Sequence, residues 1–179
     1  ISANSIIFAR YFLYNIESMN YLESRGRDSL GISINFIFEK KLNFKTNLDN
    51  TNNFSLFYKD LVKGSFLNIT AKYSKRIGMS GENSNKILDI FDEKKILNKL
   101  SFENLKSFEI YSHTRWASVG DVTNSNAHPL LEINKNNLNI CLMNGDINNY
   151  KDIKKELIKK NKFFIKDLNC KNDLQVVPS

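Results

Sequence analysis

Over the first forty residues, the spacing of the hydrophobic positions changes from that of a helix to that of a strand. Residues 4–22 predict a helix whose broad apolar stripe is formed by Ile6, Ala9, Tyr11, Leu13, Ile16, Met19 and Leu22. Asn4 or Ser5 can cap its first turn, and Gly26 can end it in the left-handed conformation. Residues 31–38 then alternate like a strand that places its isoleucines and Phe36 on one face.

The central stretch, residues 40–107, has a weaker pattern. Residues 54–61 fit either a strand or a helix, and residues 66–73 alternate like a strand. One or two short helices are predicted within residues 87–100. Because the segment also contains a polar loop at residues 47–53, we expect most of it to lie at the periphery of the fold.

Two further strands are predicted in the second half of the chain. Residues 108–111 have an apolar-polar alternation, and residues 138–143 read as a buried strand with Cys141 in the core. The Asn144-Gly145 pair that follows normally predicts a hairpin. The residues after it have a helical period instead, which favours a strand-to-helix corner whose backbone N–H groups can hold an anion.

Composition narrows the function classes. A chain of 179 residues with 41% apolar residues is large enough for one domain with a core, and it has neither a membrane-length apolar run nor a signal-peptide pattern. Cys141 and Cys170 are too few for a disulfide framework, so a cytoplasmic location is expected. The net charge of +7 comes from scattered lysines, and we therefore predict neither a nucleic-acid nor a membrane partner.

The densest candidate chemistry lies in residues 112–130. This stretch contains the single tryptophan, Trp116, and both histidines, His113 and His128. Arg115 falls at the end of a predicted strand, where binding groups are common, and its guanidinium forms a planar fork suited to a carboxylate. An ion pair with a structural aspartate is the alternative interpretation of Arg115.

Three stretches together resemble the class II, or N-terminal-nucleophile, glutamine amidotransferases, and most closely the glucosamine-6-phosphate synthase family. They are residues 22–31 (Leu-Glu-Ser-Arg-Gly-Arg-Asp-Ser-Leu-Gly), residues 112–130 with His-Thr-Arg-Trp-Ala and Asn-Ala-His-Pro, and residues 143–150 (Met-Asn-Gly-Asp-Ile-Asn-Asn-Tyr). The resemblance implies an α+β fold: a four-layer αββα sandwich with two antiparallel sheets flanked by helices.

The resemblance also implies roles for individual residues. Arg115 would hold the α-carboxylate of glutamine, and Asp173 would hold its α-ammonium group. The side-chain amide of Asn144 and the backbone N–H of Gly145 would form the oxyanion hole. For Asp173 the match is short, and an ordinary helix-start aspartate is an equal alternative.

A second group of residues would shape the same pocket. Trp116 and Ser118 would line it, and Arg25, Gly26 and Asp28 would support it from the turn between the first helix and strand. A capped turn with a local Arg–Asp pair is the alternative interpretation of that turn. No metal or organic cofactor is implied.

The function implied is hydrolysis of L-glutamine to glutamate and ammonia. The ammonia would pass to a sugar phosphate, expected to be fructose 6-phosphate, in amino-sugar synthesis. The expected partner is a sugar-phosphate isomerase-type synthase domain in the same or a partner chain, and the resemblance allows a homo-oligomer.

The chain departs from the family in two places. The family's nucleophile is an N-terminal Cys whose α-amine acts as base, whereas this chain begins Ile1-Ser2-Ala3. We therefore expect the Cys upstream of Ile1, in a single domain over residues 1–179 that is incomplete at both ends and carries an enlarged insertion at about residues 40–107. The alternative is a non-catalytic pseudo-glutaminase used for binding or assembly. Val119 replaces a family His, which leaves the ammonia acceptor open.

Overall fold

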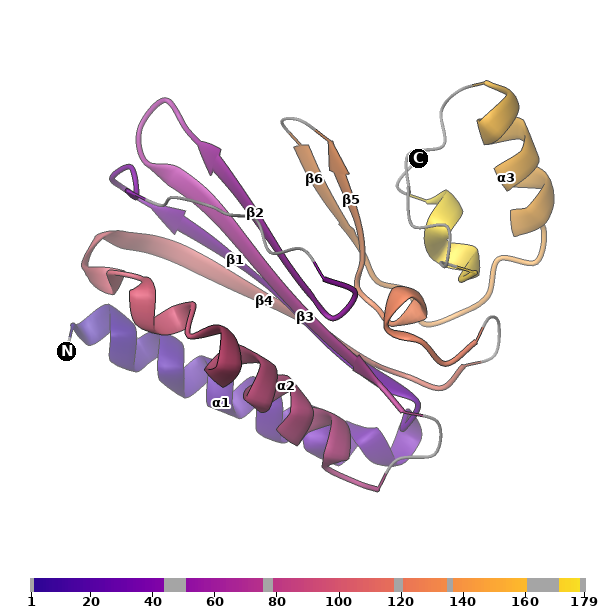
Figure 1. Ribbon diagram of the computed structural model, residues 1–179, viewed down its shortest axis with the longest axis horizontal. Helices are drawn as coiled ribbons and strands as arrows, with labels where there is room; N and C mark the ends of the chain where they lie inside the picture. The colour runs from indigo at the N-terminus through magenta and orange to yellow at the C-terminus, as the bar shows by residue number, and fades with distance from the viewer. Residues whose placement is uncertain are drawn as a thin grey trace.

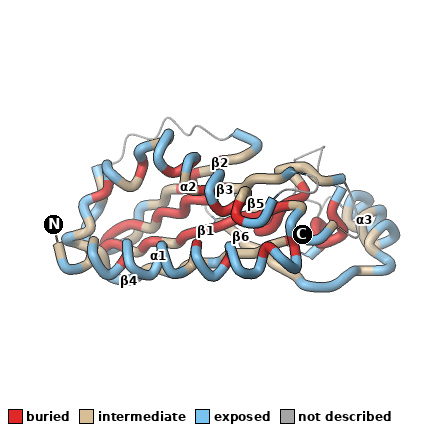
Figure 2. The backbone as a smooth tube through the Cα atoms, turned by 90° about the horizontal axis from the view of Figure 1, so that it is seen from below, coloured by how far each residue is buried: buried red, intermediate tan, exposed pale blue. Residues whose placement is uncertain are grey.

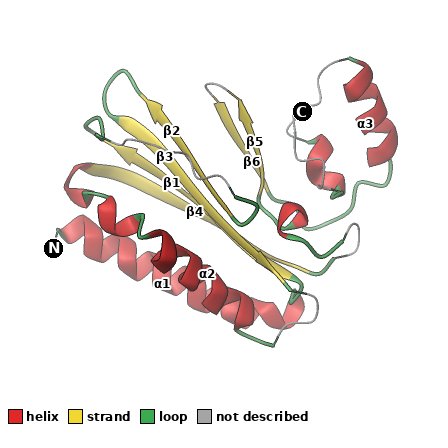
Figure 3. Ribbon diagram, in the orientation of Figure 1, coloured by secondary structure: helices red, strands yellow, loops and turns green. Residues whose placement is uncertain are grey.

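A computed structural model describes residues 2–43, 51–75, 79–117, 121–134, 137–160 and 171–177 of the chain. Over these residues the protein is α+β, with a four-stranded antiparallel sheet in the order β2-β3-β1-β4 and a two-stranded antiparallel sheet, β5-β6 (Figures 1 and 3). None of the described helices is long and apolar enough to cross a membrane.

The elements follow one another in a simple order. The α-helices and strands are α1 (Ala3–Leu22), β1 (Ser29–Phe38), β2 (Phe54–Asp60), β3 (Ser65–Ser74), α2 (Glu82–Lys94), β4 (Leu105–Arg115), β5 (Leu130–Asn134), β6 (Asn137–Cys141) and α3 (Tyr150–Lys159). Among the short 3-10 turns, η1 (Glu23–Arg25), η4 (Asn124–Asn126) and η5 (Asp173–Val176) matter for the site. The predictions of a helix at 4–22, a strand at 31–38 and a helix after Asn144-Gly145 are confirmed.

The main core lies between the four-stranded sheet and the helices α1 and α2, which cover the same face (Figure 1). The alternation predicted in β1 points its apolar residues into this layer, and Leu30, Ile32, Ile34, Phe36 and Phe38 are fully buried. Phe8 from α1 packs edge-on against Phe36, with ring centroids 5.0 Å apart. Figure 2 shows the same division, with buried strands behind an exposed outer surface of α1.

The opposite face of the sheet is polar although its centre is also buried. Ser33, Asn68 and Thr70 lie there and are almost completely excluded from solvent. The Ser33 and Thr70 hydroxyls are 2.7 Å apart, and the Asn68 amide donates to Ser33 at 2.7 Å and to Asn35 at 2.8 Å. These bonds satisfy polar groups that would otherwise be costly to bury. Hydrogen bonds rather than apolar packing therefore dominate this face.

The expectation that residues 40–107 lie mostly at the periphery is wrong. β3 sits between β1 and β2, and its Leu67 and Ile69 are fully buried, as is Ile87 of α2. The segment that fitted strand or helix becomes β2, because its backbone pairs with β3 over seven residues, from Phe54 to Asp60. About half of the main core thus comes from this segment.

Three local predictions also need correction. Ser2, not Asn4 or Ser5, caps α1, since its hydroxyl accepts the Ser5 N–H at 3.1 Å. Gly26 is not left-handed, with φ −157°, and it ends η1 rather than α1 because η1 continues the chain beyond that helix. The strand predicted as buried, β6, is only half-buried at Cys141 because it belongs to a sheet of just two strands.

One buried carboxylate joins the two core helices. Glu23 follows the last residue of α1 and is fully buried. It accepts the Gly81 N–H at 2.8 Å and the Ser84 N–H at 2.7 Å, and it also bonds the Ser84 hydroxyl. These donors belong to the first turn of α2, whose own N-cap residue, Gly81, has no side chain to cap it. Glu23 therefore caps α2 from the end of α1.

We predict that Glu23→Ala destabilises the protein by about 3 kcal/mol. The substitution leaves buried N–H donors without an acceptor, and each costs about 1–3 kcal/mol. Urea unfolding followed by circular dichroism measures the effect. Glu93→Ala, at an exposed position on α2, is the matched control and should stay within about 0.5 kcal/mol of the wild type. Equal effects of the two substitutions would contradict the capping role.

Candidate functional site

The site is built around Arg115, the last residue of β4. The turn after η1 holds the backbone of Arg115 through two contacts. The Asp28 N–H donates to the Arg115 carbonyl at 3.1 Å, and Arg27 forms a parallel bridge with Arg115. The Asp28 carboxylate accepts the Ala117 N–H at 2.9 Å. A Cβ on Gly26 would lie 3.0 Å from the Arg115 nitrogen, so glycine allows this close approach.

The segment that holds His128 packs directly on the polar face of the main sheet. Gly31 of β1 pairs with His113 of β4, and the His128 carbonyl lies above Gly31, where a Cβ would be only 2.0 Å from it. The rings of His113 and His128 are consequently neighbours, with centroids 4.6 Å apart. His128 can approach the sheet this closely because Gly31 has no side chain.

Asn172 connects His128 to the C-terminal turn η5. Its amide nitrogen donates to the Asn126 carbonyl at 3.0 Å and contacts His128 Nε2 at 2.9 Å, while its amide oxygen accepts the Leu174 N–H at 2.9 Å. The last bond caps η5 and orients Asp173, its first residue. Because the amide nitrogen is a donor, His128 Nε2 accepts, and the proton of the neutral ring is assigned to Nδ1.

Asp173 in turn holds the segment after Asn144-Gly145. Its Oδ2 accepts the Ile147 N–H at 2.5 Å, across 26 residues of sequence. Asp173 is buried, whereas Asn144 and Gly145 are exposed at the corner between β6 and α3. A side-chain contact from η5 therefore positions this corner beside the end of β4.

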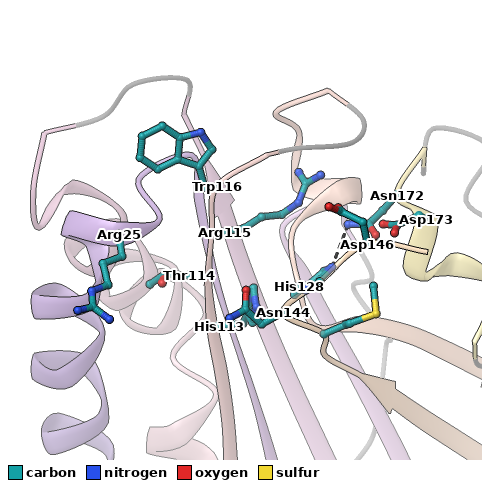
Figure 4. Close-up of a pocket in the computed structure, with 12 residues that line it drawn as sticks. Arg25, His113, Thr114, Arg115, Trp116, His128, Asn144, Asp146, Asn172 and Asp173 are labelled. Atoms are coloured by element: carbon teal, nitrogen blue, oxygen red, sulfur yellow. Dashed lines mark hydrogen bonds between the residues drawn. The ribbon is translucent and has the colours of Figure 1, made fainter. Parts of the chain in front are cut away.

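These segments enclose a pocket of about 200 Å³. Pockets for drug-sized ligands are typically about 300–1,000 Å³, so this one suits a small metabolite. Its lining includes Arg25, Arg115, Asp146 and Asp173, although the Arg25 guanidinium points away from the two aspartates (Figure 4). Figure 4 shows the Arg115 side chain pointing from β4 toward the side that holds Asp146, Asn172 and Asp173. Opposite charges on one small pocket suit a zwitterion such as an amino acid.

A second hollow, of about 480 Å³, lies between β4 and β6. Its lining includes Asn35, Tyr111 and Cys141, and it contains none of the arginine and aspartate side chains that border the smaller pocket. Burial raises the pKa of the Cys141 thiol above its usual range, which disfavours a reactive thiolate. The smaller pocket therefore carries the candidate chemistry.

The structure brings most of the predicted site residues together. The wall of the pocket includes Arg25, Arg115, Trp116, Asn144, Gly145 and Asp173. Trp116 lies at its rim, 68% exposed, and its indole points away from Arg115 and Asp173 (Figure 4). Gly26 and Asp28 contact the backbone of Arg115. Ser118 and Val119 lie outside the described residues. The chemical roles assigned to these residues remain predictions.

Four other pocket residues had been given no role in the site by the sequence analysis. His113, His128, Asp146 and Asn172 also border it. Strand alternation could have identified His113, because residues two apart on β4 share a face and Arg115 was already a candidate. Nothing in the local pattern indicated Asn172, whose role depends on contacts 44 and 46 residues away. In the described part of the chain, no three His, Cys, Asp or Glu side chains cluster as metal ligands.

Both histidines are held in their neutral form. Burial is the main cause that lowers the pKa of His128, to about 3, and the neighbouring His113 and Arg115 add to it. Burial also lowers the pKa of His113, against a hydrogen bond to the Met143 backbone that raises it. Among the described residues, Nδ1 of each ring has no hydrogen-bond partner. Neutral rings avoid adding charge beside Arg115.

Sequence comparisons find relatives of one kind. No family model matches the chain. A glutamine–fructose-6-phosphate aminotransferase [isomerizing] of Methanococcus maripaludis is 34% identical over 98 residues, which are 54% of this chain and 14% of that protein. The enzyme of the same name from Fusobacterium nucleatum is 41% identical over 70 residues, 36% of this chain and 11% of that protein.

A mammalian relative has the same name. The Rattus norvegicus glutamine–fructose-6-phosphate aminotransferase [isomerizing] 1 is 49% identical over 49 residues, 27% of this chain and 7% of that protein. These matches confirm the resemblance to glucosamine-6-phosphate synthases that the motifs indicated. In each of the three, the matched region spans 14% or less of the relative's length.

We predict that Gly31→Ala displaces the His128 segment from the sheet. A methyl group cannot fit 2.0 Å from the His128 carbonyl, so either this segment or β1 must move. We expect a loss of about 1–3 kcal/mol in the free energy of unfolding and altered imidazole NMR signals for both histidines. Gly145→Ala, at a position where a Cβ meets nothing within 4 Å, is the control. Unchanged histidine signals in Gly31→Ala would contradict the contact.

We also predict a pH dependence of stability that comes from His128. Its pKa is near 6.5 in the unfolded chain and about 3 in the folded protein. The stabilisation is therefore complete above about pH 6.5 and is lost as the pH falls toward 3, by about 1.4 kcal/mol per pH unit. Between pH 7 and pH 5, the unfolding free energy of the wild type should fall by about 2 kcal/mol more than that of His128→Gln. Equal falls would contradict the buried, neutral state of His128.

Proposed function

We propose that this chain supplies the glutamine-hydrolysing site of an enzyme similar to glutamine–fructose-6-phosphate aminotransferase. The observation that carries the proposal is the convergence of Arg115, Asp173, Asn144 and Gly145 on one small pocket. These residues come from three distant parts of the sequence, and each matches a residue type that amide hydrolysis of an amino acid requires. The names of the sequence relatives support the same assignment.

The two ends of the amino-acid backbone would be held by opposite charges. Arg115 offers two parallel N–H donors to the α-carboxylate. Asp173 would receive the α-ammonium group through the oxygen that does not bind Ile147, since the other oxygen already accepts that N–H. Bound in this way, the glutamine side chain extends from a fixed backbone, which positions its amide for attack.

Asn144 and Gly145 would stabilise the oxyanion that forms at the side-chain amide. The side chain of Asn144 and the backbone N–H of Gly145 are neutral donors that can be fixed before the reaction begins. Packing does not require glycine at position 145, because a Cβ there would meet no atom within 4 Å. The backbone does not require it either, because the φ angle of Gly145 is not positive. A glycine there leaves its N–H accessible to a ligand.

The nucleophile would be the N-terminal Cys expected upstream of Ile1, with its own α-amine as base. α1 begins at one end of the main sheet, and β1 starts at the other end (Figure 1), where it pairs with Arg115 of the pocket lining. A helix of 20 residues is about 30 Å long, and a preceding strand of about nine residues covers the same distance back. A Cys at the start of such a strand would lie near the pocket.

The rest of the proposal concerns the whole protein. We propose that the two antiparallel sheets and outer helices belong to an N-terminal-nucleophile hydrolase sandwich with four layers. The ammonia would pass to fructose 6-phosphate in a sugar-phosphate isomerase-type domain. The matched region is a small fraction of the relatives' length, which leaves room in them for such a domain.

We predict that Arg115→Lys in the full-length protein lowers glutamine-dependent amino-sugar formation about 100-fold. Lysine keeps the charge but loses the two-point grip, and errors near 1 Å in positioning can cost this much. Ammonium-dependent formation should persist, because free ammonia bypasses the pocket. Both rates are measured on the same preparation, with Arg10→Lys on the outer side of α1 as the matched control.

Equal loss of both activities would mean that Arg115 maintains the fold and would count against the proposal. A full-length protein that binds glutamine without releasing glutamate, and whose mature N-terminus is not Cys, Ser or Thr, would instead be a pseudo-glutaminase. Edman sequencing of the mature N-terminus and a glutamate-release assay distinguish the two functions.

A further inference from the structure

The pocket has one more carboxylate than the proposed glutamine contacts use. Its lining includes two acidic residues, Asp146 and Asp173. The resemblance assigns the α-ammonium group of glutamine to Asp173 alone and gives Asp146 no role. Asp146 directly follows Gly145 and is exposed at the corner between β6 and α3. A second anionic group therefore borders the site beside the one already assigned to the ligand.

A backbone contact holds the two aspartates near one another. The Oδ2 atom of Asp173 accepts the N–H of Ile147 at 2.5 Å. Because that nitrogen is bonded to the carbonyl carbon of Asp146, the Asp173 carboxylate lies within about 5 Å of the Asp146 Cα. Figure 4 shows both side chains on one side of the pocket, the side toward which Arg115 points. Like charges that are neighbours repel one another, and a cation bound between them relieves the repulsion.

The start of α3 does not explain a carboxylate at position 146. An acidic residue in the first turn of a helix stabilises the helix dipole, and the effect falls off outside that turn. In α3 this residue is Asp152, and the helix begins at Tyr150 with Asn149 as its N-cap. Asp146 lies three residues before the N-cap. The pocket, rather than the helix, is therefore the place where its charge acts.

An α-ammonium group needs more acceptors than Asp173 supplies. The group carries three N–H donors. Since Oδ2 of Asp173 already accepts the Ile147 N–H, the other oxygen of that carboxylate is the one assigned to the ligand. A donor without an acceptor in a pocket costs binding energy, and a charged acceptor forms the stronger bond. Asp146 supplies the second anionic acceptor on the same side.

We propose that Asp146 is a specificity-determining residue that binds the α-ammonium group of glutamine together with Asp173. We term the two residues the ammonium subsite. The inference rests on the proposed function, because that function places the α-carboxylate of glutamine on Arg115. The carboxylate and the ammonium group are attached to the same carbon atom, so the ammonium group then falls on the side that holds both aspartates (Figure 4). The subsite selects γ-amides that have a free α-amine over those whose α-amine is absent or acylated.

Two ligands that differ in the α-ammonium group isolate this contact. L-Glutamate carries the group, glutarate has the same two carboxylates without it, and neither is hydrolysed. In the full-length protein, we expect Asp146→Asn to weaken L-glutamate binding about tenfold relative to glutarate binding, as the loss of one charge-assisted hydrogen bond predicts. The ratio of the two dissociation constants is the measure, because removing a negative charge favours both anionic ligands. Isothermal titration calorimetry gives both constants.

Two variants serve as controls for this measurement. Asp152→Asn makes the same change of charge on α3, at a residue that is not among the described residues lining the pocket. It should leave the ratio of the dissociation constants unchanged. Asp146→Glu keeps the carboxylate and should retain most of the preference for L-glutamate. Circular dichroism verifies that each variant folds.

Glutamine hydrolysis gives a second readout. The ammonium contact is the same in the bound substrate and in the transition state, so its loss raises KM and leaves kcat nearly unchanged. We expect Asp146→Asn to raise the KM for glutamine about tenfold, with kcat within about twofold of the wild type. Damage to the corner that holds Asn144 would instead lower kcat, because an oxyanion donor acts in the transition state.

An unchanged ratio of the two dissociation constants in Asp146→Asn would overturn the proposal. If both ligands bind more weakly by the same factor, Asp146 only shapes the corner. If both bind more tightly by the same factor, Asp146 competes with the ligand for Arg115. A protein that shows the predicted change in the ratio, but releases no glutamate from glutamine, supports the ammonium subsite and contradicts the proposed function.

Discussion

The approach of the His128 carbonyl to Gly31 is the contact on which the geometry of the pocket depends. It places a loop from the second sheet directly on β1, at the one position in that strand without a side chain. From there the contacts follow in sequence: His128 to Asn172, Asn172 to the start of η5, and Asp173 to Ile147 beyond Gly145. The first and last of these hydrogen bonds join segments 44 and 26 residues apart in the chain, and the middle one is the local cap of η5, so a shift at Gly31 propagates to the pocket wall.

The main sheet has two faces that are stabilised in different ways. The face toward α1 and α2 is apolar, and burial of side chains such as Ile34 and Phe36 drives its formation. The other face buries Ser33, Asn68 and Thr70, which contribute little hydrophobic stabilisation and require mutual hydrogen bonds. A polar interior of this kind fixes a single arrangement, because alternative packings leave donors and acceptors unpaired. The pocket forms at the end of this polar face, where His113 and Arg115 project from β4.

The parts of the fold that could be predicted are those in which one short segment contains the information. The helical stripe of α1 and the alternation of β1 are local, and the end of β4 at Arg115 follows from the apolar-polar run before it. The core position of β3 could not be predicted in this way, because it depends on pairing with β1 rather than on its own pattern. Gly26 illustrates the same limit, since its glycine serves a contact with Arg115 that is 89 residues away. Most pocket residues were found through motifs, whereas Asn172 lies outside all of them and acts through hydrogen bonds to Asn126 and His128 that no local pattern encodes.

The cap that Glu23 provides has a consequence for how the protein opens. The Gly81 and Ser84 amides that bind Glu23 belong to α2, but their acceptor belongs to the end of α1. Those amides can exchange with solvent only when the last turn of α1 and the first turn of α2 separate, so we expect the two helix ends to behave as one cooperative unit in native-state exchange. The turn that holds Arg115 starts directly after this unit, and the Asn83 amide of α2 also donates to the Arg27 carbonyl within it, at 2.9 Å. Local unfolding at this corner would therefore release the arginine side of the pocket before the sheet itself comes apart.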